Sequence, residues 1–231
     1  MKRVSFTLPS IVILFMITTL SVSAQSTETR QVSKFQAVAS EGPFTVHIKI
    51  DGTEGVKIST EPDVIKLIET VVEDGTLKIK FKDHLENGEG NTSSPIDIYV
   101  NAKMLTSLVK TGSGYITVDN GVVTGSKVNI VLTGSGNITA SVKSENLKII
   151  ITGSGSIHLN GTSDKAETII NGPGLMDSRH LEIKDASVLI NGSGNAYFIA
   201  DNSISARVNG TGNVIYSGNA IVTGGGVRKA E

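Results

Sequence analysis

Apolar and polar residues alternate with a period of two on either side of a short glycine-rich sequence that recurs along residues 106–231. Strict alternation is the pattern of a half-buried β-strand, whereas an amphipathic helix repeats about every 3.6 residues. The pattern therefore predicts a repeating unit of strand, tight glycine turn, strand and wider polar turn. The inward positions are expected to be Ile130, Leu132, Ile149, Ile151, Val188 and Ile190 before the turns, and Ile138, Ala140, Ile157, Leu159, Val214 and Tyr216 after them.

The recurring sequence is Thr or Asn, Gly, a small residue, Gly. Its first glycines follow one another after 18 to 22 residues, except for a last step of 14 residues to Gly224. Such a period is typical of one coil of a solenoid, and the short last step predicts a frayed or capping coil. The glycines expected to form the structural turns are Gly112, Gly114, Gly134, Gly136, Gly153, Gly155, Gly172, Gly174, Gly192, Gly194, Gly210 and Gly212.

Two physical reasons favour glycine at these turns. A reversal between two stacked strands demands positive φ, which only glycine adopts without steric cost. Successive coils also lie about 4.8 Å apart, which leaves little room for side chains. The Thr or Asn before each turn is expected to form a ladder of hydrogen-bonding side chains. We expect this ladder to be structural, with binding of a repetitive polymer as the alternative.

Residues 25–105 lack the glycine period but still indicate β-structure, so we divide the chain into this N-terminal β region and solenoid repeats at 106–231. Strands are predicted at 44–50, 56–60, 77–81 and 96–100, with a hairpin turn at Asp74-Gly75. A short helix is predicted at 62–68 and a mobile polar loop at 83–95. We expect the N-terminal region to cover the open end of the solenoid, because bare strand edges invite aggregation.

The first 24 residues have the pattern of a signal peptide. Lys2 and Arg3 precede an apolar run at 11–20, and small residues at 22–24 offer a cleavage site after Ala24. The run has about half the length that a membrane-spanning helix needs, so no membrane insertion is expected. The chain contains no cysteine, which excludes disulfides and a lipid-bearing cysteine. We therefore expect an exported protein in the periplasm, at the cell surface or outside the cell.

The glycine turns follow a segment of the form Phe35-x-x-Val38, Val46-x-Ile48, Gly75-x-Leu77-x-Ile79 and Ile96-x-Ile98-x-Val100. Together these features resemble the head GIN domain family of auto-transporter adhesins, from about Phe35 to the C-terminus. The resemblance implies an exported protein of the Bacteroidetes type, a fold similar to the pectin-lyase-like β-helices, an adhesive role and no catalytic residues. The expected fold is all-β: a flattened parallel β-helix of 19–20-residue coils, right-handed by the general crossover rule.

One outward column after the turns carries the nearest approach to acid–base chemistry. It reads Thr117, Thr139, His158, Asp177, Tyr197 and Ile215, so three titratable side chains are expected on adjacent coils. Each is a common exposed strand residue, and we interpret His158, Asp177 and Tyr197 as surface candidates. His47, His84 and His180 lack partners at ligand spacing, so no metal site is expected. A polysaccharide lyase or hydrolase acting on an extracellular glycan is the alternative function.

An apolar column occupies outward positions before the turns, where polar residues are expected. It reads Val109, Val131, Ile150, Ile169, Leu189, Arg207 and Ile221. Uncovered, such a column would form a patch of several hundred Å². We expect Val131, Ile150, Ile169 and Leu189 to be buried against a second copy of the chain, in preference to the N-terminal segment. An adhesive surface is the remaining interpretation.

Composition excludes several other functions. The formal net charge is −1, and the chain has no Trp and four Tyr, so nucleic acid is not an expected partner. Gly112-Ser-Gly114 lacks the third glycine of a dinucleotide fingerprint, and Ile138 and Ile157 stand where a calcium nonapeptide needs Asp. No cofactor is expected. The sequence favours a non-catalytic envelope protein for adhesion, glycan contact or scaffolding, with a host or matrix glycan or protein as partner.

Overall fold

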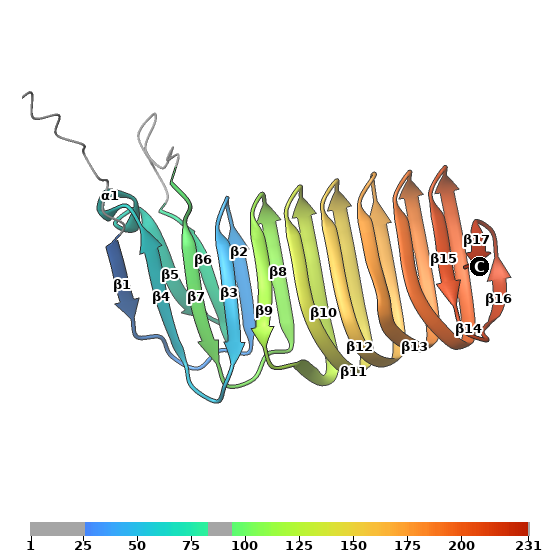
Figure 1. Ribbon diagram of the computed structural model, residues 1–231, viewed down its shortest axis with the longest axis horizontal. Helices are drawn as coiled ribbons and strands as arrows, with labels where there is room; N and C mark the ends of the chain where they lie inside the picture. The colour runs from blue at the N-terminus through green and yellow to red at the C-terminus, as the bar shows by residue number, and fades with distance from the viewer. Residues whose placement is uncertain (1–25, 83–93, 231) are drawn as a thin grey trace, which may run out of the picture.

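The computed structural model describes residues 26–82 and 94–230, which form an elongated stack of β-coils (Figure 1). The glycine turns line one long edge of the stack, and the wider polar bends line the other. The nearly all-β solenoid is confirmed. In the described ranges, no helix is long and apolar enough to cross a membrane. The expected signal peptide and all of the 83–95 loop except its last two residues lie outside the described residues, and the handedness and the division at residue 105 stay predictions.

The regular coils are built from strands paired in parallel, one strand directly above the next. They are β8 (Ser107–Gly112), β9 (Tyr115–Asn120), β10 (Val123–Gly134), β11 (Asn137–Gly153), β12 (Ser156–Asn171), β13 (Leu175–Gly192), β14 (Asn195–Gly210) and β15 (Asn213–Ser217). In β11 to β14 a single strand leaves one glycine turn, continues through the wide bend and runs into the next glycine turn, so each of these coils contributes to two sheets. We name the strand segments that run into the glycine turns the ascending sheet. Those that leave the turns, together with the strands that extend the same sheet on the N-terminal side, are named the descending sheet.

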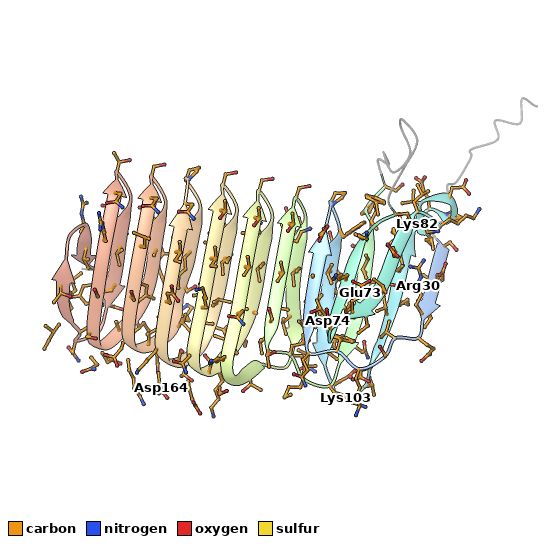
Figure 2. All side chains as sticks on the ribbon, turned by 180° about the vertical axis from the view of Figure 1, so that it is seen from behind. Arg30, Glu73, Asp74, Lys82, Lys103 and Asp164 are labelled. Carbon is orange, nitrogen blue, oxygen red and sulfur yellow. The ribbon has the colours of Figure 1, made fainter. Side chains whose placement is uncertain are left out.

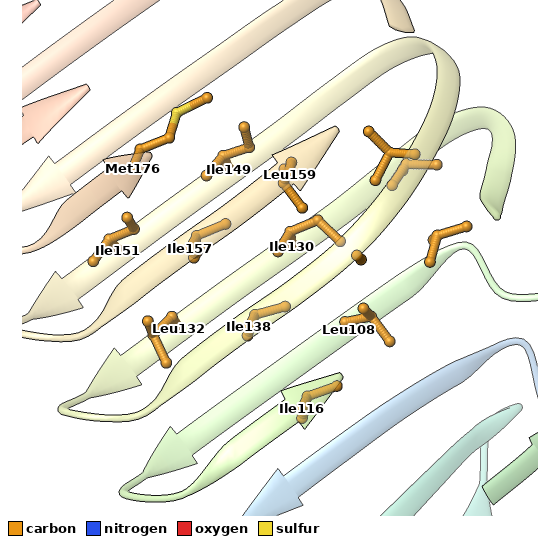
Figure 3. Close-up of a cluster of buried hydrophobic side chains, with 14 of the residues drawn as sticks. Leu108, Ile116, Ile130, Leu132, Ile138, Ile149, Ile151, Ile157, Leu159 and Met176 are labelled. Carbon is orange, nitrogen blue, oxygen red and sulfur yellow. The ribbon is translucent and has the colours of Figure 1, made fainter. Parts of the chain in front are cut away.

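The pairing register aligns equivalent residues of successive coils. Leu132 pairs with Ile151, Ile151 with Ile170 and Ile170 with Ile190, and Gly134 pairs with Gly153. The same columns fill the interior, where Ile130, Ile149 and Ile138 are fully buried (Figure 3). Full burial of such a side chain stabilises the fold by about 1.5–3 kcal/mol. The inward alternation predicted from the sequence is therefore the core of the molecule.

The N-terminal region continues the stack in an order that differs from the sequence. Strands β2 (Ala37–Glu41) and β3 (Thr45–Ile50) form a coil of their own, which pairs with β8 and β9 on one side. On its other side lie β6 (Thr76–Phe81) and β7 (Asp97–Ala102), which come later in the chain. The β2–β3 coil turns at Gly42, with φ of 125°. The sequence analysis missed this coil because its turn contains a single glycine.

Antiparallel strands end the stack on the N-terminal side. Strand β1 (Ser26–Arg30) pairs antiparallel with β4 (Gly55–Thr60), and β4 pairs antiparallel with β7. After the short helix α1 (Pro62–Ile65), β5 (Ile68–Glu73) forms a hairpin with β6 through Asp74 and Gly75, both at positive φ. Arg30, labelled in Figure 2, lies at this end of the stack. Its guanidinium donates to the carbonyl oxygens of Ile65 and Ile68, at 3.2 and 2.8 Å. The region covers the open end as expected, with a helix shorter than predicted.

The C-terminal coil is shortened. Strands β16 (Ile221–Gly224) and β17 (Val227–Lys229) pair with β14 and β15. Gly224 pairs with Ala206 and not with Gly210, so the last turn comes four residues early in the register. Ile221 consequently pairs with Ser203 and is 75% exposed. Its assignment to the column of Arg207 was wrong, because that assignment assumed that every coil keeps the same spacing to its turn.

Candidate functional site

The first position of each turn requires glycine because of its backbone conformation. All six first glycines, from Gly112 to Gly210, have φ between 89° and 141°, where residues with a Cβ are strained. Among the second glycines of these pairs only Gly114 has a positive φ. Gly194 shows the other reason for glycine, because a Cβ there would lie 2.6 Å from the carbonyl oxygen of Gly174. Positive φ was therefore the wrong reason for most second glycines, whereas close stacking was the right one.

Side-chain amides staple the glycine edge. Asn191 donates from Nδ2 to Asn171 Oδ1 at 2.9 Å, and Asn209 donates to Asn191 Oδ1 at 2.8 Å. A second pair follows the turns, where Asn213 Nδ2 donates to Asn195 Oδ1 at 3.2 Å. The expected ladder forms at these coils. Because the amides bind one another, this edge has a structural role and offers fewer free groups to a ligand.

The outer face of the descending sheet carries a continuous column of polar and aromatic side chains. Pairing places Tyr99 beside His47, His47 beside Thr117, and Thr117 beside Thr139. The rings of Tyr99 and His47 stack with centroids 5.1 Å apart, and Lys57 Nζ lies 4.8 Å from the Tyr99 ring centroid. The column predicted from Thr117 onward thus extends into the N-terminal region. The sequence analysis missed this extension, because the order of the coils in space differs from their order in the chain.

His158, Asp177 and Tyr197 lie further along the same face. Thr139 pairs with His158, and Asp177 pairs with Tyr197, with a register irregularity between His158 and the next coil. Arg179 binds the Asp177 carboxylate at 2.7 Å, and its guanidinium lies 4.2 Å from the Tyr197 ring centroid. The sequence analysis overlooked Arg179. His158, Asp177 and Arg179 line a surface hollow of about 280 Å³. The Asp177 carboxylate there is bound by Arg179 and not by His158.

The ascending sheet presents an aliphatic outer face instead. Val109, Val131, Ile150, Ile169 and Leu189 pair in one register, and Arg207 ends the column. We name the five aliphatic residues the aliphatic stripe. Its members are half-buried by their neighbours in the column. The N-terminal region stacks at the end of the coils, so within the described part of the chain it does not cover the stripe.

The family of the chain follows from comparison with known proteins. Residues 34–220 match the family model described as "Putative auto-transporter adhesin, head GIN domain". The chain belongs to this family. No curated protein sequence matches the chain.

Solved structures show that this head GIN domain has relatives with the same fold. A "putative adhesin" from Bacteroides fragilis is 21% identical, with a TM-score of 0.76, and the match covers 90% of this chain and 97% of the relative. One from Parabacteroides merdae is 19% identical, with a TM-score of 0.67 and coverage of 90% and 96%. A "Putative lipid binding protein" from Parabacteroides distasonis is 23% identical, with a TM-score of 0.62 and coverage of 90% and 97%.

One buried lysine joins the N-terminal region of this head GIN domain to its regular coils. Lys110 is fully buried in the inward column that Leu132 and Ile151 continue. Its Nζ donates to the Gly42 carbonyl oxygen and to Ser40 Oγ, both in the β2–β3 coil. Burial lowers the pKa of Lys110 to about 8. A lysine at an inward position of the alternation was the available signal, and the sequence analysis did not use it.

Proposed function

We propose that this head GIN domain is a non-catalytic adhesive module of the cell envelope, which binds an extracellular glycan or matrix protein through the outer face of the descending sheet. The observation that carries the proposal is the placement of the tyrosines. Tyr99, Tyr115 and Tyr197 all point outward from the descending sheet, and Tyr99 and Tyr115 are 38% and 51% exposed. Tyrosine and arginine are enriched where proteins bind partners, because each combines apolar area with a polar group.

The chemistry of the same face supports binding over glycan cleavage. Cleavage by general acid–base catalysis needs carboxyl groups free to exchange protons with substrate. Asp177 is held by Arg179, and Asp119 lies 3.2 Å from His47 Nδ1. Both carboxylates therefore have partners within the surface. The adhesin description of the family agrees with a binding role, and the expected signal peptide agrees with export.

We also propose that the aliphatic stripe is the contact between two copies of the chain. The members of the stripe pair in register from coil to coil, and the described residues place no covering segment over it. Burying a few hundred Å² at about 25 cal/mol per Å² favours association by a few kcal/mol before entropic losses. A dimer through the ascending sheets would leave both descending sheets exposed for a ligand.

A binding screen tests the adhesive function. The purified protein is applied to immobilised glycans and matrix proteins, together with the variant Tyr99→Ala/Tyr115→Ala/Tyr197→Ala. The matched control is Lys148→Ala/Glu167→Ala on the outer face of the ascending sheet, where these two side chains form an ion pair at 3.2 Å. We expect the wild type and the control to bind the same targets and the tyrosine variant to lose them. Equal binding by all three proteins would refute the assignment to the descending sheet.

A further inference from the structure

A hollow of about 440 Å³ opens on the descending sheet at its N-terminal end. Four neighbouring strands form its floor, in the order β1, β4, β7 and β3. One row across these strands consists of Thr29, Lys57, Tyr99 and His47. The next row contains Gly55, Asn101 and Lys49. Gly55 contributes no side chain to the row, and the surface is hollow there. We name this feature the Gly55 groove.

The glycine at position 55 has no structural requirement in its own strand. Its φ is not positive, unlike that of Gly153 in a turn. A Cβ built on Gly55 would meet nothing within 4 Å. Side chains with a Cβ, and β-branched ones in particular, suit a strand better than glycine does. We interpret the glycine at position 55 as a means of keeping the space above the strand open. The glycines of the turns are needed instead for backbone conformation or for close stacking.

The rim of the Gly55 groove is held in place by its own hydrogen bonds. Asn101 Nδ2 donates to Asp51 Oδ2 at 2.8 Å and to Thr53 Oγ1 at 3.3 Å. The hydrogen bonds from Thr53 lower the pKa of Asp51. Lys103, on the edge of the wide bends (Figure 2), pairs with Glu54 at 3.6 Å. The loop between β3 and β4 is thus braced, which lowers the entropic cost of binding a ligand.

Two lysines give the groove a positive charge. Lys57 is held over the ring of Tyr99, which stacks in turn on His47, so its cation has a defined position. Lys49 projects from the neighbouring row. Neither lysine forms an ion pair within 4.0 Å in the described ranges, although Lys49 lies near enough to Asp51 on the rim to help lower the pKa of that carboxyl. The one carboxylate in the lining, Glu54, is paired with Lys103.

We propose that the Gly55 groove binds an acidic saccharide, a sugar that carries a carboxylate or a sulfate. Lys57 and Lys49 bind the anionic group, and Thr29, Gln31, Thr53 and Asn101 exchange hydrogen bonds with the sugar hydroxyls. Neutral hydroxyl and amide side chains outnumber charged side chains in the lining. The proposal rests on the adhesive function and names the ligand class of its surface.

Calorimetric titration with matched oligosaccharides tests the proposal. The probes are an oligogalacturonate, a sulfated galactan oligomer and a neutral galactan oligomer. We expect the groove to bind one or both acidic probes, with an affinity that falls as salt rises, and to bind the neutral oligomer at least about tenfold more weakly. Comparison of the two acidic probes distinguishes a carboxylate from a sulfate as the recognised group.

Variants locate the binding. Gly55→Val should fill the groove and weaken the binding of the acidic probe about tenfold or more. Its melting temperature should stay at or above that of the wild type. Gly225→Val is the matched control, because Gly225 also lacks a positive φ and has open space around it, at the opposite end of the stack. Lys57→Gln should weaken the binding of the acidic probe. Tyr99→Phe, which keeps the ring under Lys57, should weaken this binding less than Tyr99→Leu.

Several outcomes would overturn the proposal. They are equal affinity for acidic and neutral probes, full binding by a stable Gly55→Val protein, or equally tight binding of an acidic peptide such as oligoglutamate. If the acidic probes fail while the broader screen still finds a target lost in the tyrosine variant, the groove proposal falls and the adhesive function stands. If neither the screen nor the acidic probes show binding, both fall.

Discussion

The two sheets of each coil share one core but present different outer surfaces. The ascending sheet shows the aliphatic stripe, whereas the descending sheet shows Tyr99, His47, His158 and Tyr197 beside charged neighbours. The inward residues of both sheets are mostly apolar. Stacking constrains the interior and the turns of every coil, but it leaves the outward residues free to differ. The difference between the outer faces is therefore the basis for the two roles that we propose, contact with another copy for the ascending sheet and ligand binding for the descending sheet.

The largest expected effect comes from the glycine edge that both sheets share. Gly153→Val places a β-branched residue at φ of 112°, with its Cβ 2.6 Å from the Gly134 carbonyl oxygen. We expect a loss of about 3 kcal/mol or more, and a fall of roughly 10 °C in melting temperature. Thermal unfolding followed by circular dichroism measures the change. Gly55→Val is the control that keeps stability, and an unchanged melting curve for Gly153→Val would contradict the turn geometry.

The second effect concerns Lys110, a charged residue buried inside the ascending sheet. The pKa of Lys110 is lowered from 10.5 to about 8 in the folded protein, so between these values the unfolded chain binds more protons. Stability should therefore rise with pH in this window, by about 2.5 kcal/mol between pH 7 and pH 10. Lys110→Met should lack the rise. Urea unfolding of both proteins at the two pH values measures the difference, and parallel behaviour would mean that the lysine is solvated.

The third effect concerns the association of two copies of the chain, which we assign to the ascending sheet and not to the descending sheet. Ile150→Lys/Ile169→Lys places two charges in the aliphatic stripe, and burying them would cost more than the contact contributes. We expect sedimentation to show a change from dimer to monomer with little change in melting temperature. Thr117→Lys/Thr139→Lys, at paired positions on the descending sheet, should keep the wild-type mass. A monomeric wild type would show that the stripe is not a contact between copies.

The smallest effect concerns the ion pair between Arg179 and Asp177 on the descending sheet. Arg179→Ala removes the partner of Asp177 and the cation over Tyr197. We expect binding of the screened target to weaken by about tenfold or less, and His158→Ala to change it less than Arg179→Ala. Neither wild type nor variants should release reducing ends or unsaturated products from polysaccharides. Turnover that disappears with His158→Ala or Asp177→Ala would establish the lyase or hydrolase alternative.

The regular coils could be predicted from the sequence because each position has one dominant constraint. Ile151 and Ile190 reveal the inward column by their parity, and Gly153 reveals the turn by its period. The β2–β3 coil could not be found in this way. Its turn has one glycine at Gly42, and its neighbours in the stack are separated from it in the chain.

The candidate site was predicted only in part for the same reason. His158, Asp177 and Tyr197 belong to successive coils, so counting residues placed them together. Tyr99, His47 and Lys57 meet because β7, β3 and β4 pair out of sequence order, and no period indicates this pairing. Gly55 resembled any other glycine until the structure showed the open space above it.

The most direct test of separate roles for the two faces uses the absence of cysteine from the chain. Thr117→Cys on the descending sheet and Val131→Cys on the ascending sheet each provide one site for a bulky maleimide. The account predicts that the label at position 117 abolishes binding of the screened target and leaves the dimer intact. The label at position 131 should dissociate the dimer and leave binding by the monomer intact. If both labels affect binding and mass alike, or if their effects are reversed, the assignment of ligand and partner to the two faces is contradicted.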